Sequence, residues 1–71
     1  CRVAFTNDNV SGVLGHLLSI LADHQVNVID MVNKSRNDVA YTILDIEEKP
    51  SDEVIDAIRN VKHVISLRVI C

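Results

Sequence analysis

The alternation of apolar and polar positions predicts two strand–helix–strand units in succession. Residues 1–6 alternate between apolar and polar side chains, which is typical of a half-buried strand. Apolar residues then recur every three or four positions across residues 11–24, as in a helix with one buried face. Residues 26–34 and 39–46 are two further strand-like runs, and a polar turn with Asn37-Asp38 at its tip separates them.

The remaining segments complete the pattern. Ser51 is a candidate N-cap for a second helix, whose buried stripe is Val54, Ile55, Ile58 and Val61. Residues 64–71 form the fourth strand, and Ser11 or Asn9 can cap the first helix. The order β-α-β-β-α-β predicts an α+β, ferredoxin-like fold: a four-stranded antiparallel sheet with two helices on one face. Residues 39–46 are apolar on both faces, so we place this strand centrally.

Length and charge exclude several classes of function. Seventy-one residues make a single domain. The net charge is −3 and the basic residues are scattered, which argues against a nucleic-acid partner. We expect no signal peptide, and no apolar run of these residues is long enough to span a membrane, so we also expect no membrane association and a cytoplasmic location.

Two cysteines stand at the ends of the chain, and three histidines are spread along it. The first and fourth strands should be adjacent and antiparallel, which would make Cys1 and Cys71 neighbours. A cytoplasmic location would leave their thiols free. The start at Cys1, without a methionine, leads us to expect a piece of a larger protein. His16, His24 and His63 lack metal-binding spacing, so we expect structural or solvent-facing roles for them.

Small polar side chains crowd the segment before the first helix, where Asn7, Asp8 and Asn9 follow one another. A helix N-terminus offers free N–H groups to an anion, and Gly12 lets a ligand approach the backbone near Val13. Amides can donate to a carboxylate and accept from an ammonium, so the segment suits a small zwitterion. The structural alternative is that these residues only form a turn and cap the helix.

A family resemblance rests on these same residues. The segment NDNVSGVLGHLLSILADHQVNVIDM resembles the ACT domain, with a polar loop, Gly followed by Val-Leu, a helix, and VNV leading into the next strand. The stretches NKSRNDVAYTILDIEE and VISLRVI are similar to the C-terminal ACT domain of bacterial D-3-phosphoglycerate dehydrogenase. The resemblance covers the whole chain. It implies that residues 1–71 are a regulatory, non-catalytic domain without a cofactor, belonging to a larger NAD-dependent enzyme of serine biosynthesis.

The resemblance also implies a homodimer and a ligand. In that family two copies pair through their second strands, and L-serine binds between the first loop of one copy and the second strand of the other. The family's ligand-contacting asparagines fall on Asn9 and Asn27. A histidine of serine-sensitive members is Asn7 here, and Ser11 stands where proline is frequent. The expected site for L-serine, or another small amino acid, comprises Asn7, Asp8, Asn9, Gly12 and Val13, with Asn27 of the other copy.

Several alternatives remain open from the sequence. Asn27 is a lone amide in the apolar run VNVIDMV. It can face a partner's loop or form a hydrogen bond with its own turn. The domain can be an amino-acid sensor, a ligand-free dimerisation module, or an ACT domain of another enzyme such as threonine deaminase. RNA binding is disfavoured, because Tyr41 is the one candidate for stacking on a base.

Overall fold

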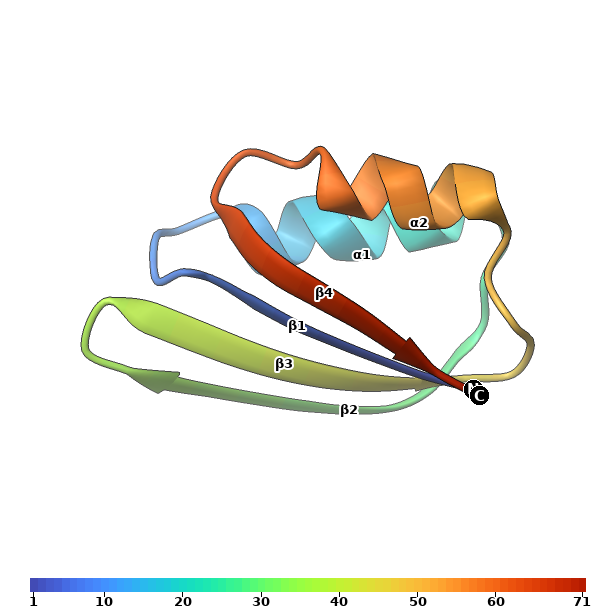
Figure 1. Cartoon of the computed structure of the whole chain (residues 1–71), viewed down its shortest axis with the longest axis horizontal. Helices are drawn as coiled ribbons and strands as arrows, with labels where there is room; N and C mark the ends of the chain where they lie inside the picture. Colours follow the sequence, from blue (N-terminus) through green and yellow to red (C-terminus); the bar gives the residue numbers. More distant parts are fainter.

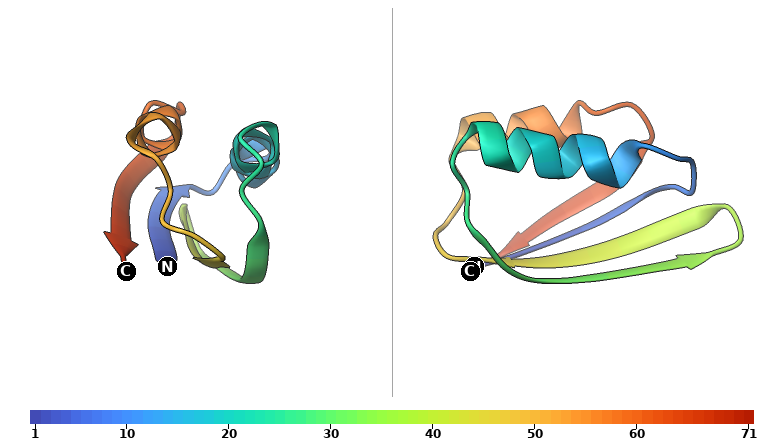
Figure 2. Two further views of the ribbon diagram at one scale, coloured as in Figure 1. Left: turned by 90° about the vertical axis from the view of Figure 1, so that its right-hand side faces the viewer. Right: turned by 180° about the vertical axis from the view of Figure 1, so that it is seen from behind.

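The computed structural model describes residues 1–71 and contains the six expected elements (Figure 1). They are β1 (Arg2–Asp8), α1 (Val13–Asp23), β2 (Val28–Arg36), β3 (Val39–Ile46), α2 (Asp52–Arg59) and β4 (Val64–Ile70). The strands form one antiparallel sheet in the order β2-β3-β1-β4. Both helices cover the same face of this sheet (Figure 2). The predicted ferredoxin-like fold is therefore confirmed, including the central position of β3.

The core lies between the sheet and the two helices. Alternate residues of the central strands point into it, among them Phe5 of β1 and Leu44 of β3. Leu17 of α1 and Ile58 of α2 close it from above, and all four side chains are at most 2% exposed. Each such side chain contributes roughly 1.5–3 kcal/mol when it is removed from water. The predicted apolar faces of both helices are thus the buried ones.

β1 is longer than the alternation predicts. Asn7 and Asp8 belong to the strand, where they pair with Ala40 and Val39 of β3. The expectation that they lie in a loop is wrong. β1 is flanked by β3 and β4, and the ladder on both sides outweighs the low strand propensity of these two residues.

β2 begins at Val28, two residues later than expected, and forms one edge of the sheet. A register shift between Val28 and Asp30 places Ile29 in a bulge. Asn27 therefore precedes the strand rather than belonging to it. Apart from Val28, every residue of β2 is exposed.

The chain ends meet, as the topology requires. β1 and β4 pair Arg2 with Ile70, so Cys1 and Cys71 lie side by side with their Cα atoms 4.3 Å apart. The two cysteines form a disulfide, which corrects the expectation of free thiols.

No helix is long and apolar enough to span a membrane.

Candidate functional site

α1 begins without any side-chain cap. Its N-cap is Gly12, in the left-handed conformation with φ 89° and ψ −14°. The predicted caps, Asn9 and Ser11, do not serve this helix. Val13, Leu14 and Gly15 are the first three helical residues, and their N–H groups have no acceptor within the chain. The first turn also holds no acidic residue. No side chain of the first turn therefore offsets the positive potential at this end of the helix.

The start of α2 is different. The Ser51 hydroxyl accepts a hydrogen bond from the Val54 N–H at 3.3 Å, as predicted. Asp52 and Glu53 in the first turn provide negative charge near the positive end of the helix dipole. The contrast marks the N-terminus of α1 as the end that is suited to an external anion.

The polar residues before α1 make hydrogen bonds within the chain. Asn7 is 4% exposed, and its Nδ2 donates to the carbonyl oxygen of Asp8 at 2.8 Å. Asn9 Nδ2 donates to the carbonyl oxygen of Asn37 at 3.0 Å, which ties this segment to the β2–β3 turn. Because the Asn9 amide nitrogen is engaged there, its Oδ1 is the atom left to accept from a ligand.

Asp8 has a partner that the sequence did not suggest. Its Oδ2 lies 3.2 Å from Nδ1 of His63, and its N–H donates to the His63 carbonyl at 2.8 Å. His63 takes a left-handed conformation with φ 80° in the turn before β4. The two residues are 55 positions apart in the chain. Only the β1–β4 pairing brings them together.

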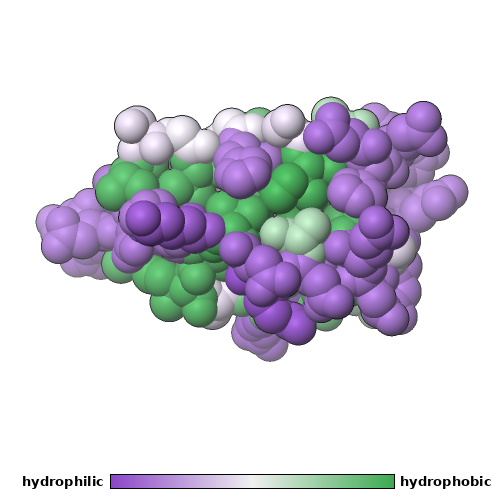
Figure 3. All heavy atoms as spheres, turned by 90° about the horizontal axis from the view of Figure 1, so that it is seen from above, coloured by the Kyte–Doolittle hydropathy of each residue, from purple (hydrophilic) through white to green (hydrophobic).

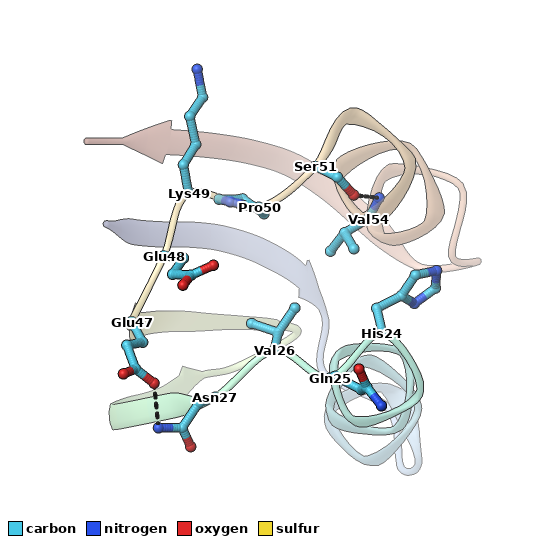
Figure 4. Close-up of a pocket in the computed structure, with 10 residues that line it drawn as sticks. All are labelled: His24, Gln25, Val26, Asn27, Glu47, Glu48, Lys49, Pro50, Ser51 and Val54. Carbon is cyan, nitrogen blue, oxygen red and sulfur yellow. Dashed lines mark hydrogen bonds between the residues drawn. The ribbon is translucent and has the colours of Figure 1, made fainter.

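Asn27 lines a polar hollow of about 360 Å³ (Figure 4). Its Nδ2 donates to Oε2 of Glu47 at 3.0 Å, and the Glu47 N–H donates to the Asn27 carbonyl at 3.1 Å. The Asn27 Oδ1 has no partner within the chain. The hollow is lined by His24, Gln25, Val26, Asn27, Glu47, Glu48, Lys49, Pro50, Ser51 and Val54.

The two halves of the expected site lie at opposite ends of the domain. The β1–α1 segment is at one end of the sheet, whereas Asn27 is at the other end, near the chain termini (Figure 1). One chain therefore brings together Asn7, Asp8, Asn9, Gly12 and Val13, but not Asn27. The expected site would therefore need Asn27 from a second copy.

The other ionisable groups do not form a reactive cluster. Arg2 Nε donates to Asp45 Oδ1 at 2.8 Å. This hydrogen bond lowers the pKa of Asp45 and raises that of Arg2. The Nδ1 of His24 lies 2.9 Å from the Ile20 carbonyl. No group of three His, Cys, Asp or Glu residues is arranged to hold a metal ion.

The sequence model of the ACT domain matches residues 2–63. The chain belongs to the ACT domain family. ACT domains are regulatory modules rather than catalytic ones, and members of the family generally bind amino acids and dimerise. No curated protein matches the chain.

Solved structures share this fold at low sequence identity. The ACT domain from GTP pyrophosphokinase of Chlorobium tepidum has a TM-score of 0.79 and 16% identity, covering 94% of this chain and 91% of that one. The regulatory subunit of aspartate kinase from Thermus thermophilus has a TM-score of 0.72 and 14% identity, covering 96% and 49%. Protein BT0572 from Bacteroides thetaiotaomicron has a TM-score of 0.68 and 23% identity, covering 90% and 44%. The chain thus spans about half of the two longer proteins or less, and none of the three links it to serine biosynthesis.

Proposed function

We propose that this ACT domain senses L-serine at the joint of a homodimer, as the regulatory domain of a D-3-phosphoglycerate dehydrogenase. The resemblance of NKSRNDVAYTILDIEE and VISLRVI to that enzyme supports the choice of parent. NAD would be bound by the catalytic part of the parent enzyme and not by this domain.

The N-terminus of α1 carries the proposal. Its first three N–H groups have no acceptor in the chain, and Gly12 places no side chain between them and a ligand. A carboxylate there would accept hydrogen bonds from Val13 and Leu14 and meet the positive end of the helix dipole. An amino acid supplies such a carboxylate.

The ammonium group of the ligand has two acceptors. The Nδ2 atoms of Asn9 and Asn27 are both engaged within the chain, which leaves each Oδ1 free. In the dimer, Asn9 Oδ1 and the partner's Asn27 would accept from the ammonium, while Asp8 adds negative potential nearby. Asn7 is buried, so we assign it to holding the Asp8 backbone, and the serine hydroxyl would bind a backbone group.

The edge of β2 provides the dimer contact. It is unpaired, and its first half exposes three apolar side chains, with Ile29 65%, Met31 41% and Val32 42% exposed. Such an edge is prone to aggregate unless another strand covers it. Antiparallel pairing of β2 with its copy about a two-fold axis reverses the direction of the second copy. The start of the partner's β2 then lies at the β1–α1 end, where the site needs it.

Because the ligand would touch both copies, its binding would tighten the pair. That difference in contacts between the tightened and relaxed pairs is what could transmit a signal to a catalytic domain.

Thermal unfolding with and without L-serine tests the proposal. At one hundred times the dissociation constant a ligand adds about 2.7 kcal/mol to the free energy of unfolding, which raises the melting temperature of a domain of this size by roughly 11–22 °C. L-alanine, which lacks the hydroxyl of L-serine, serves as the control ligand.

A ligand-free dimerisation module is the second candidate. It is favoured by the hydrogen bonds that Asn7, Asp8, Asn9 and Asn27 already make within the chain. A dimer whose melting temperature is unchanged by L-serine and by other small amino acids would select this alternative. A shift with another small amino acid, but not with L-serine, would instead point to a different parent enzyme.

A further inference from the structure

β3 is apolar on both of its faces, although helices cover only one face of the sheet (Figure 2). Leu44 and Ile46 point toward the helices and are buried, whereas Val39, Tyr41 and Ile43 alternate with the buried positions and point away from the helices. Val39 and Tyr41 are each 43% exposed. An antiparallel sheet with one face in water normally carries polar side chains on that face. The packing of the single chain therefore does not account for the apolar outer face of β3.

The strands on either side of β3 extend this apolar surface. Ile43 pairs with Val32 of β2 on one side and with Ala4 of β1 on the other. Side chains that lie directly opposite each other on paired strands share a face of the sheet. Val32 is 42% exposed, and Ala4 and Ile43 are half-buried. These residues form one continuous surface, which we call the outer patch: Ala4, Val32, Val39, Tyr41 and Ile43.

Basic side chains without acidic partners border the outer patch. They are Lys34 and Arg36 of β2, which lie opposite residues of the patch on β3, and Arg68 of β4, which lies opposite Ala4. All three are exposed. None of them takes part in an ion pair of the chain. Their charges are therefore available to an external partner.

The acidic side chains of the same face are already engaged. Asp45 accepts from Arg2 at 2.8 Å, and Asp8 lies 3.2 Å from the ring of His63. Asp30 accepts from a backbone N–H group at 2.9 Å. The outer face thus presents unpaired cations and no unpaired carboxylate.

The charge of the domain is unevenly distributed as a result. The outer face of the four strands holds four basic and three acidic side chains, a net charge of +1. The other three basic and seven acidic side chains carry −4, which gives the −3 of the whole chain. Figure 3 looks onto the helical side, where hydrophilic atoms gather along one long edge. The outer face is the cationic side of an acidic domain.

We propose that the outer face docks an acidic amphipathic helix from outside residues 1–71. The apolar stripe of that helix covers the outer patch, and its carboxylates meet Lys34, Arg36 and Arg68. The apolar face of a sheet is stably covered by a helix or by another sheet. A second copy of the same face is unsuitable, because unpaired cations would meet unpaired cations. The proposal requires neither the β2 pairing nor the binding of an amino acid.

Fluorescence anisotropy of two labelled amphipathic peptides tests the docking on the unmodified 71-residue chain. One peptide is built from leucine and glutamate, and the other has lysine at every glutamate position. The leucine–glutamate peptide should bind at least about tenfold more tightly. Its affinity should fall as salt is added, because salt screens exposed charges. In NMR spectra of the chain, its binding should shift the amide signals of Ala4, Tyr41 and Ile43.

Three exposed positions supply the variants. Arg68→Glu should weaken binding of the leucine–glutamate peptide roughly tenfold, because an attraction becomes a repulsion. β4 is at the opposite edge of the sheet from β2, so this variant leaves the proposed dimer contact untouched. Tyr41→Ala should also weaken binding about tenfold, through the loss of an aromatic contact. Lys62→Glu is the matched control: it makes the same change of charge in the turn before β4 and should leave the affinity unchanged.

Two kinds of result would overturn the proposal. The first is equal affinity for the two peptides, or amide shifts that are confined to α1 and α2. The second is a dimer in sedimentation that Tyr41→Ala dissociates, since a second copy would then cover the outer patch. Melting temperatures of the variants close to that of the unmodified chain show that each affinity is measured on folded protein.

Discussion

Replacement of Asn27 by alanine removes one acceptor for the ligand's ammonium group and little else. The side chain is exposed, and its one bond within the chain, to Glu47, is also exposed. Losing an exposed bond of this kind costs less than about 1 kcal/mol of stability. Losing the hydrogen bond between Asn27 and the charged ammonium group of the ligand costs about 1.5–3 kcal/mol of binding free energy. This corresponds to roughly ten- to a hundredfold in affinity. Each dimer has two such sites, and both are weakened equally.

Calorimetric titration with L-serine measures this change. Asn27→Ala should bind ten- to a hundredfold more weakly than the unmodified chain, with the dimer and the melting temperature of the ligand-free protein nearly unchanged. Asn60→Ala is the matched control, because the side chain at the C-terminus of α2 makes no hydrogen bond. Equal affinity in Asn27→Ala and the unmodified chain would refute the assignment of Asn27 to the site.

Three further predictions concern stability. Cys71→Ser opens a disulfide that links residues 70 positions apart. If loop entropy dominates, the free energy of unfolding in denaturant should fall by about 4.4 kcal/mol. An unchanged denaturation midpoint would contradict this. Leu17→Ala removes a fully buried side chain of α1 and should cost about 2–5 kcal/mol in the same assay; a loss below 1 kcal/mol would show that the core is misplaced. Arg2 lowers the pKa of Asp45 from its ordinary value of 3.8, so the folded state binds this proton less readily than the unfolded state. The contribution of the pair is therefore present above pH 3.8 and is lost as the pH falls through the lowered pKa. Asp45→Asn should reduce the acid sensitivity of the melting temperature in that range, and an identical pH profile would argue against the ion pair.

Local signals in the sequence were sufficient for much of the fold. β3 matches the predicted residues 39–46, because its apolar run is bounded by a turn on one side and a polar connector on the other. α2 starts where Ser51 and the acidic residues after it indicate. In both cases the residues that define the boundary lie within a few positions of it.

Boundaries set by tertiary pairing were not predictable in this way. The extension of β1 through Asn7 and Asp8 depends on strands that lie far away in the sequence. The contact between Asp8 and His63 arises for the same reason. The disulfide depends on redox environment as well as on proximity, and the sequence predicted only the proximity.

The candidate site was predicted in part. The sequence indicated an anion site at the start of α1, but assigned the cap to Asn9 or Ser11 rather than to Gly12. The absence of a side-chain cap strengthens that prediction, because it leaves the N–H groups available. Side-chain hydrogen bonds such as that of Asn27 with Glu47 follow from the folded arrangement alone.

Direct binding of L-serine to the unmodified, disulfide-linked chain is the decisive measurement. Calorimetry should give a saturable heat with two ligands per dimer, and sedimentation of the same sample should show the dimer tightened. No heat with millimolar L-serine would contradict the serine assignment. No heat with any other small amino acid would contradict amino-acid sensing itself.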